Sequence, residues 1–418
     1  MNNLTNILMS YASTKRFPKD TYPTRIYNLL KEQGYNPDLL KYIHITGSKG
    51  KGSLACSSFE LLKRAGFKTG LFISPHIFDI RERFITDQGM ISEEALLNLM
   101  KKFNELFKNN DLHFFEICLF LALVYFLDQG CEYVVLEVGV GGRFDPTNFC
   151  CPEVSLLGHI SIEHKDFLGN TIEEIAYDKA GIIKKDIVAL SVNQTPVVKK
   201  ILKSQGKVYF IDDIVAITNI IYKDQGTSQF DLKITIHNRD IIIKNIILNR
   251  IGEAHIVNFV LAVAGIYYCI PEFSEGIVHY ISQQKIPYRM DLVRDDVIID
   301  TSHNGVSFDN LMISLSRMNW KNIVLYITIL QGKELADIAE VLKNYKYLFL
   351  KVVFFDFESN VVKISNGKEL YDLLKNDIQS EYVENIKDII LEENNKKVFS
   401  GSFYSVPLII DLLNDQNQ

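Results

Sequence analysis

Short apolar runs alternate with helical patterns through the first half of the chain. The runs that predict buried strands are Tyr42–Thr46, Phe67–Ser74, Tyr133–Val138, Val154–Ile160 and Asp186–Val192. Between them, apolar residues at helical spacing predict helices over Ser53–Ala65, Glu93–Phe107, Phe115–Leu127 and Thr171–Lys179. Hydrophobic strands separated by helices are typical of βαβ units, so we predict a mostly parallel sheet.

The pattern changes between about Val208 and Leu248. Two Ile-rich segments of alternating polarity, Asp231–His237 and Asp240–Leu248, are joined through Asn238. They predict an antiparallel ribbon on the edge of the parallel sheet. A helix is predicted next, over Ala254–Tyr268.

Strands and helices alternate again in the last third of the chain. The predicted strands are Val297–Asp300, Ile323–Ile329, Leu348–Phe355 and Lys397–Ser400. A chain of 418 residues is long enough for two domains. We therefore expect an α/β protein with a mostly parallel sheet domain over residues 1–286 and a smaller Rossmann-like α/β domain over residues 287–418.

Composition and charge narrow the class of protein. The chain is 47% hydrophobic and 23% charged, which is typical of a globular protein rather than a disordered one. A net charge of −6 gives no global basic field, so we expect neither a nucleic acid nor a membrane partner. The longest apolar run, Ile117–Leu127, is too short to span a membrane and predicts a buried helix.

The ends and the cysteines favour a cytoplasmic protein. The first ten residues have no basic region and no apolar stretch of the kind found in secretory signals. The six cysteines lack metal-ligand spacing, and the adjacent Cys150 and Cys151 are poorly placed for a disulfide with each other. We expect reduced thiols.

A glycine-rich loop follows the first predicted strand and precedes a helix. Its residues are Gly47, Ser48, Lys49, Gly50, Lys51, Gly52 and Ser53. Such a loop can direct backbone N–H groups at phosphate oxygens, with Lys51 reaching the terminal phosphates and Ser53 offering a hydroxyl to Mg²⁺. The alternative is a flexible turn without a ligand. Lys49 is either a solvated cation or a second phosphate contact.

A carboxylate lies at the end of another predicted strand. Glu137 follows an otherwise apolar run, and ligands gather at the carboxyl ends of strands in open α/β sheets. Because a buried lone carboxylate is costly, a metal ion there would stabilise it. His164 follows the next strand and could complete a Mg²⁺ site; alternatively it is an ordinary hydrogen-bonded surface histidine. The glycines at 139, 141 and 142 do not complete a dinucleotide fingerprint, because Phe144 stands where a glycine is needed.

These segments together resemble the folylpolyglutamate synthase/dihydrofolate synthase family, within the Mur-type ATP-dependent amide ligases. The resemblance runs along nearly the whole chain. It is carried by residues 42–53, Ser74-Pro75-His76, Arg81–Arg83, 136–148, Glu163-His164, 168–171, Lys179–Lys184, 252–258, Pro287-Tyr288-Arg289, 300–304 and 400–404.

The resemblance implies roles for individual residues. Lys51 and the loop would hold ATP, and Asn258, Arg289, Asp300 and His303 would contact the nucleotide. Ser53, Glu137 and His164 would bind Mg²⁺, and Lys179 matches a lysine that is carbamylated in many of these ligases. The family's folate-binding positions match Ser74, Pro75, His76, Arg83 and Asp145.

The implied chemistry is the joining of L-glutamate to dihydropteroate or a reduced folate. Transfer of the ATP γ-phosphoryl group to the acceptor carboxylate gives an acyl phosphate, which the amine of glutamate attacks, releasing ADP and phosphate. The resemblance further implies that the C-terminal domain closes over ATP and binds glutamate, and that the protein is a monomer. Lys51, His164 and Lys179 are the residues expected to support catalysis.

Several positions depart from the family pattern. Lys49 replaces Asn, Glu163 replaces Asp, Thr301-Ser302 replaces Gly-Ala, Gly305 replaces Pro, and His113 and Leu119 stand where relatives often have Thr. If the helix with Leu119 lines the pterin pocket, the acceptor differs from an ordinary folate; otherwise these are neutral changes on a core helix. Two alternatives stay open: a Mur-type ligase acting on a non-folate acid, and a nucleotide-binding protein without ligase activity.

Overall fold

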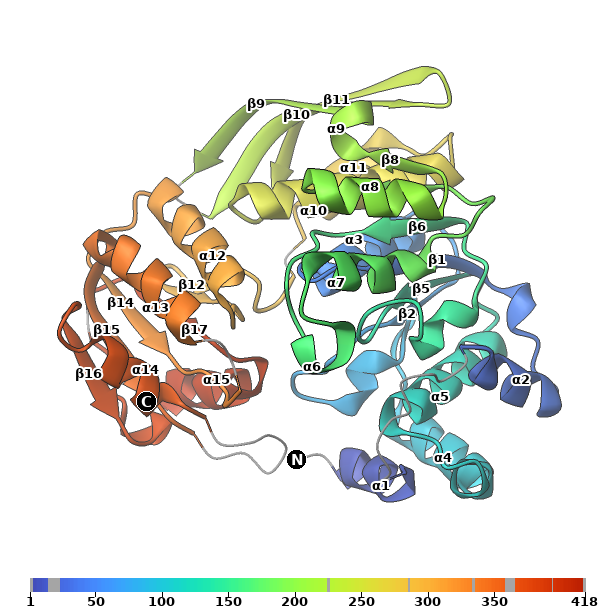
Figure 1. Ribbon diagram of the computed structural model, residues 1–418, viewed down its shortest axis with the longest axis horizontal. Helices are drawn as coiled ribbons and strands as arrows, with labels where there is room; N and C mark the ends of the chain where they lie inside the picture. Colours follow the sequence, from blue (N-terminus) through green and yellow to red (C-terminus); the bar gives the residue numbers. More distant parts are fainter. Residues whose placement is uncertain are drawn as a thin grey trace. The chain divides into compact units, whose positions relative to one another are not determined.

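The computed structural model divides into two compact units (Figure 1). It describes residues 3–13, 23–223, 226–284, 286–332, 335–357, 365–392 and 394–415. Unit 1 comprises Met1–Thr218, Asp231–Ile246 and Val257–Ser282; unit 2 comprises Asn219–Phe230, Ile247–Ile256 and Gln283–Gln418. That residues 1–286 and residues 287–418 form separate domains with different ligand-binding roles stays a prediction.

Unit 1 is built on an eight-stranded sheet in the order β4-β3-β2-β5-β1-β6-β7-β8. All neighbours pair in parallel except β2–β3 and β3–β4, which are antiparallel. The prediction of a mostly parallel α/β sheet is therefore confirmed. The strands are β1 (Lys41–Thr46), β2 (Thr69–Phe72), β3 (Ile85–Thr86), β4 (Gly89–Met90), β5 (Tyr133–Glu137), β6 (Val154–Leu157), β7 (Ala189–Ser191) and β8 (Val208–Phe210).

The helices begin where side chains can satisfy their first backbone N–H groups. Ser92 caps α4 by accepting a hydrogen bond from the Ala95 N–H, and Thr171 with Glu174 forms a capping box at α7. The helices that unit 1 contains or shares are α1 (Asn3–Tyr11), α2 (Thr24–Glu32), α3 (Lys51–Arg64), α4 (Glu93–Asn109), α5 (Phe114–Asp128), α6 (Lys165–Leu168), α7 (Ile172–Lys179), α8 (Pro196–Gln205), α9 (Ile211–Ile214), α10 (Glu253–Cys269) and α11 (Glu275–Ser282).

Helix α5 is apolar on every side because it lies inside the core. Its residues Ile117–Val124 have no exposed surface and pack with apolar residues of α1, α2 and α4. This confirms the buried helix predicted from the longest apolar run. Among the described residues, no helix is long and apolar enough to cross a membrane.

The predicted ribbon is present but belongs to a separate sheet. Strands β9 (Val215–Lys223), β10 (Thr227–Ile236) and β11 (Arg239–Leu248) pair in the order β11-β10-β9, and the edge strands of the large sheet are β4 and β8. The prediction of a ribbon on the edge of the large sheet is therefore wrong. Alternating polarity fixes which side chains share a face, but not which sheet a ribbon joins. His237 and Asn238 both have positive φ, as a tight hairpin turn requires.

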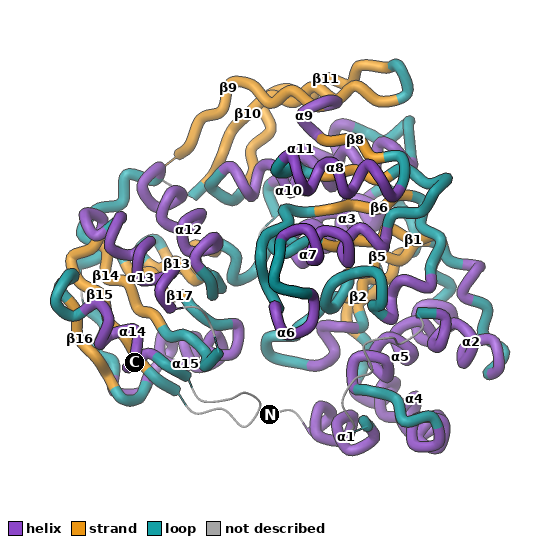
Figure 2. The backbone as a smooth tube through the Cα atoms, in the orientation of Figure 1, coloured by secondary structure: helices purple, strands orange, loops and turns teal. Residues whose placement is uncertain are grey.

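Unit 2 contains a six-stranded sheet in the order β12-β13-β17-β14-β15-β16 (Figure 2). All neighbours are parallel except β12, which is antiparallel to β13. The expectation of a second, smaller α/β sheet is confirmed. Its elements are β12 (Asp291–Arg294), β13 (Val297–Ile299), β14 (Ile323–Ile327), β15 (Phe349–Phe355), β16 (Ser380–Val383), β17 (Lys397–Ser400), α12 (Gly305–Arg317), α13 (Leu335–Asn344), α14 (Gly367–Leu374) and α15 (Val406–Asp415).

Candidate functional site

The glycine-rich loop connects β1 directly to α3. Gly50 has a φ of 78°, and a Cβ added there would lie 2.3 Å from Nδ2 of Asn258. A Cβ on Gly47 would lie 3.0 Å from Cα of Gly158. Glycine is therefore required at both positions, by conformation and by close approach. The contact also places Asn258, a predicted nucleotide residue, against the loop.

The loop is tied to the segment that follows β6. The Ser48 hydroxyl donates to the Ser161 carbonyl over 2.9 Å and accepts from the Ser161 N–H over 3.0 Å. The Ser48 N–H donates to the His159 carbonyl over 2.7 Å, and the Lys49 N–H reaches the same oxygen over 3.4 Å. These bonds hold the loop backbone in one conformation. Gly52 and Ser53 lie in the first turn of α3, where backbone N–H groups favour an anion.

Two lysines donate to one carbonyl at the start of the loop. Nζ of Lys51 lies 3.0 Å, and Nζ of Lys179 3.1 Å, from the carbonyl oxygen of Gly47. Lys179 also forms an ion pair with Oε1 of Glu163 over 2.8 Å, and these two side chains are 1% and 11% exposed. Lys51, Lys179 and Glu163 are thus brought together near the Gly47 carbonyl.

The pKa values of this cluster reflect opposing effects. Burial lowers the pKa of Lys179 to about 8, although the Glu163 carboxylate opposes that shift. Burial raises the pKa of Glu163, but the positive charges of Lys179 and Lys51 outweigh it and bring the value to about 2. Glu163 is therefore ionised at neutral pH, and Lys179 carries a proton that it holds less tightly than an exposed lysine.

Glu137 lies at the carboxyl edge of the sheet, as predicted from its place at the end of an apolar run. It pairs in register with Ile45 near the end of β1, is 3% exposed, and accepts the Ser74 N–H at Oε2 over 2.9 Å. The buried Ser53 hydroxyl and this carboxylate are oxygen donors of the kind that Mg²⁺ prefers, so their chemistry fits that ion. His164 is the residue that precedes α6, with a φ of 47°.

The metal site as predicted stays a prediction. Within the described ranges, no group of three or more His, Cys, Asp or Glu residues is arranged to hold a metal ion. The predicted set contains only two such residues, Glu137 and His164, together with Ser53.

The predicted folate-side residues form a connected set after β2. The Ser74–Pro75 peptide is cis. Nε of Arg83 donates to Nδ1 of His76 over 3.1 Å, and the Arg83 guanidinium lies 5.3 Å from the ring centre of Phe114. Burial and the Arg83 charge lower the pKa of His76 to about 4, so this imidazole is neutral at physiological pH. Arg83, which is 6% exposed, is the fixed cation of this set.

Asp145 supports its own loop. Oδ2 accepts the N–H groups of Gly139 and Val140 over 3.0 and 3.1 Å, and Oδ1 accepts the N–H and the hydroxyl of Thr147 over 3.0 and 2.6 Å. Burial raises its pKa, and the hydrogen bonds oppose that shift. Because a carboxylate has about four acceptor positions, a ligand would have to displace one of these donors. The predicted pterin contact stays a prediction.

The start of α5 contains residues that sequence reasoning missed. The ring of Phe115 packs edge-on against Phe72 with centroids 5.4 Å apart, and a Cβ on Gly139 would lie 2.8 Å from it. An aromatic pair at the start of an apolar helix is indistinguishable from core in the sequence. His113 lies 3.1 Å from the buried Glu116 carboxylate, whereas Leu119 is fully buried in the core. Leu119 is therefore a packing residue.

Unit 2 brings together Arg289, Asp300 and His303, the residues predicted there. The Arg289 guanidinium lies 4.3 Å from the ring centre of Phe403, and the His303 ring lies 5.9 Å from the same ring. Asp300 accepts the Met290 N–H over 3.0 Å and the Ser302 N–H over 2.8 Å. Asp300 thus fixes the backbone beside Arg289. Phe403 is a further member, from the segment 400–404 that carries the resemblance, and no role was predicted for it.

Comparison with known proteins places this arrangement in a family. Residues 45–266 match the model of the Mur ligase middle domain. The folylpolyglutamate synthase of Lacticaseibacillus casei is 28% identical over 81% of this chain and 82% of its own length. The dihydrofolate synthase/folylpolyglutamate synthase of Bacillus subtilis is 27% identical over 91% of this chain and 92% of its own.

A solved structure agrees with these relatives. The folylpolyglutamate synthase of Mycobacterium tuberculosis complexed with ADP and AMPPCP superposes with a TM-score of 0.81 at 25% identity, covering 92% of this chain and 93% of that one. The α/β architecture of the chain agrees with this likeness. Along most of its length the chain is similar to folylpolyglutamate synthases and dihydrofolate synthases, and it belongs to the Mur ligase family.

Proposed function

We propose that the protein is an ATP-dependent ligase that joins L-glutamate to a folate-type carboxylate, dihydropteroate or a reduced folate. The observation that carries the proposal is the loop at Gly47–Gly50, on which Lys51, Lys179 and Asn258 converge. Such a loop suits the phosphates of ATP, and the folylpolyglutamate synthases among the relatives supply the substrate class.

The loop residues would bind and orient ATP. Backbone N–H groups of Gly50–Ser53 at the start of α3 would face phosphate oxygens, and Lys51 would neutralise the terminal phosphates. Phosphoryl transfer needs little covalent help from the protein, so positioning and charge neutralisation supply most of the catalysis. Asn258, which lies against Gly50, would contact the nucleotide beside the loop.

Ser53, Glu137 and His164 would hold Mg²⁺, which when bound neutralises charge on the phosphate oxygens. The supporting observation is the buried Glu137 carboxylate at the sheet edge beside the loop. Carbamylation of Lys179 needs its neutral amine, which is more accessible at a pKa of about 8 than for an exposed lysine. The ion pair with Glu163 competes with that modification.

The acceptor would bind near the segment after β2. Arg83 is a buried cation, and aromatic rings at Phe114 and Phe115 lie beside it and beside Asp145. A cation with aromatic surface suits an acid that carries a flat ring, because the cation pairs with a carboxylate and the rings stack. Ser74, Pro75 and His76 would shape the same surface.

In unit 2, Arg289, Asp300 and His303 would contact the nucleotide, and this unit would bind glutamate. Arg289 and His303 both lie against Phe403, and Asp300 holds the Met290 N–H beside Arg289, which supports a shared role. We further propose that the protein is a monomer of the cytoplasm, in keeping with buried thiols such as Cys150, whose pKa burial raises to about 12.

The test is ADP release by the purified protein with Mg²⁺-ATP and L-glutamate, comparing dihydropteroate, tetrahydrofolate and no acceptor. We expect release that depends on both glutamate and a pterin. Release with neither pterin, from a protein that still binds ATP, contradicts the folate assignment and indicates another carboxylic acid. ATP binding without turnover on any acid contradicts the ligase itself.

A further inference from the structure

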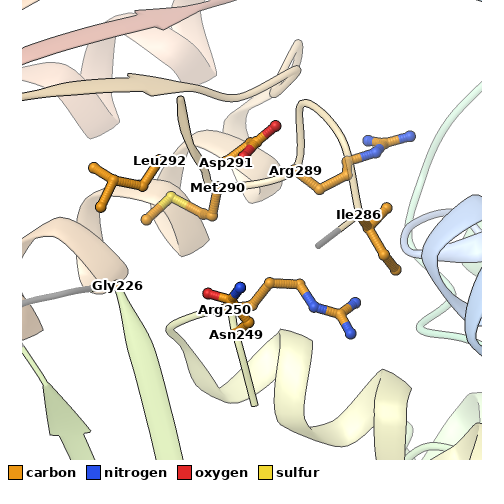
Figure 3. Close-up of a pocket in the computed structure, with 8 residues that line it drawn as sticks. All are labelled: Gly226, Asn249, Arg250, Ile286, Arg289, Met290, Asp291 and Leu292. Carbon is orange, nitrogen blue, oxygen red and sulfur yellow. The ribbon is translucent and has the colours of Figure 1, made fainter. Parts of the chain in front are cut away.

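A small pocket in unit 2 is lined by two arginines (Figure 3). It lies between the residues that follow β11 and the segment that leads into β12. The lining residues are Gly226, Asn249, Arg250, Ile286, Arg289, Met290, Asp291 and Leu292. Arg289 was predicted from the resemblance, whereas Arg250 was not.

The pocket is basic. Arg250 is only 3% exposed, and Figure 3 shows its guanidinium and that of Arg289 reaching toward the same side of the pocket. Their charge is felt by a neighbouring imidazole: burial, and then the charges of Arg250 and Arg289, lower the pKa of His255 to about 3. The carboxylate among the lining residues, Asp291, accepts the Tyr288 N–H over 3.2 Å. The lining thus carries two guanidinium groups and one carboxylate.

Hydrogen bonds hold the segment that contains Arg250 in place. Ser228 Oγ donates to the Arg250 carbonyl over 2.8 Å, and Asn249 Nδ2 donates to the Gln283 carbonyl over 3.2 Å. On the other wall, Tyr288 and Met290 flank Arg289 with φ values of 60° and 51°.

Those two φ values are costly for residues other than glycine. Such conformations persist where the surrounding structure enforces them, and they concentrate at ligand sites. Asp300 holds the backbone conformation at Met290 by accepting a hydrogen bond from the Met290 N–H. The backbone therefore presents Arg289 in one fixed direction, as a preformed binding site requires.

We propose that this pocket is an oxyanion subsite in which Arg250, together with Arg289, receives a carboxylate or phosphate group of a substrate. Guanidinium groups present paired N–H donors that match two oxygens of either group. The identity of the substrate rests on the proposed function: the oxyanion is a carboxylate of L-glutamate or a phosphate of the nucleotide.

The experiment compares Arg250→Gln and Arg250→Lys with Arg317→Gln. Arg317 lies in the same unit but hydrogen-bonds the Tyr222 hydroxyl over 2.9 Å, outside the pocket, so it controls for the loss of an arginine. The KM values for ATP and for L-glutamate are measured separately from ADP release. We expect Arg250→Gln to raise one of them at least about 10-fold, and Arg250→Lys to raise it less because it keeps the charge without the paired donors.

The substrate whose KM rises identifies the source of the oxyanion. Unchanged KM and kcat for both substrates in folded Arg250→Gln overturns the proposal, and so does the same rise in Arg317→Gln. If Arg250→Gln does not fold, Arg250→Lys decides between these outcomes by the same comparison.

Calorimetric binding of ADP, inorganic phosphate and L-glutamate to the wild type and Arg250→Gln keeps this test independent of turnover. A wild type that releases no ADP, yet binds one of these anions more tightly than Arg250→Gln, contradicts the proposed function and supports the subsite. A wild type that binds none of them overturns the subsite.

Discussion

Replacing Glu163 by glutamine should destabilise unit 1 by about 3 kcal/mol. The change keeps the shape of the side chain but removes the charge that lies 2.8 Å from Lys179. Removing one member of a buried ion pair costs about 3–5 kcal/mol, because the other charge is left in a medium that solvates it poorly. The lower end applies here, since Glu163 is 11% exposed and Lys179 has a pKa near 8 and can lose its proton.

The magnitude is large enough to measure by thermal unfolding. For a unit of this size, 1 kcal/mol shifts the midpoint by about 2–4 °C, so the expected drop is roughly 6–12 °C. The control is Glu105→Gln. Glu105 pairs with Lys108 over 3.3 Å, but the two side chains are 72% and 52% exposed. An exposed pair contributes about 0.2–1 kcal/mol, so this variant should unfold within about 4 °C of the wild type.

A double variant separates the charge effect from a simple loss of contacts. Replacing a whole buried pair by apolar or neutral groups is often neutral, so Glu163→Gln/Lys179→Met should recover most of the lost stability. The reasoning fails if Glu163→Gln unfolds at the same temperature as Glu105→Gln. It also fails if the double variant is less stable than the single one.

Three further outcomes are expected. Lys51→Ala should lower turnover by at least about 100-fold while the midpoint of unfolding stays near that of the wild type, because this side chain contributes charge near the loop rather than core packing; active protein would contradict the assignment of the loop. Gly50→Ala should weaken nucleotide binding, because a φ of 78° costs about 1–2 kcal/mol for a residue with a side chain and the new Cβ would meet Asn258. Calorimetry measures the affinity, and an affinity equal to that of the wild type would contradict the proposed role of Gly50. The folded-state pKa of Glu163, about 2, lies below its ordinary 4.5, so its contribution to stability is complete above pH 4.5 and is lost as the pH falls toward 2. Urea unfolding at pH 5 and pH 3 should therefore show a larger acid loss in the wild type than in Glu163→Gln, and equal losses would contradict this.

The glycine-rich loop and the strands around it could be predicted from the sequence because their signals are local. Gly47 and Gly50 lie within a few residues of Lys51, between an apolar run and a helical pattern. The structure shows why each glycine is needed, since a Cβ would meet Gly158 or Asn258. The burial of Glu137 also follows from a local pattern, a carboxylate that ends an apolar strand.

Other features depend on contacts between distant segments. The pairing of Glu163 with Lys179 requires α7 to return to the loop, which no local pattern specifies. The three-stranded sheet escaped prediction because alternation does not reveal which strands become neighbours. The burial of Arg250 could not be predicted, because nothing in the neighbouring sequence distinguishes a buried arginine from an exposed one.

The two lysines on the Gly47 carbonyl have a consequence for how a nucleotide enters. For Lys51 to reach a phosphate, its ammonium must let go of the backbone oxygen it contacts over 3.0 Å. If the Gly47 carbonyl lost its hydrogen bond in this partly buried position, the movement of Lys51 would be unfavourable, because a buried acceptor without a donor costs about 1–3 kcal/mol. Lys179 remains on the same oxygen, so the acceptor keeps a donor throughout. The Lys51 ammonium can thus move to a bound phosphate while the Gly47 carbonyl stays hydrogen-bonded. The ion pair with Glu163 keeps Lys179 in place.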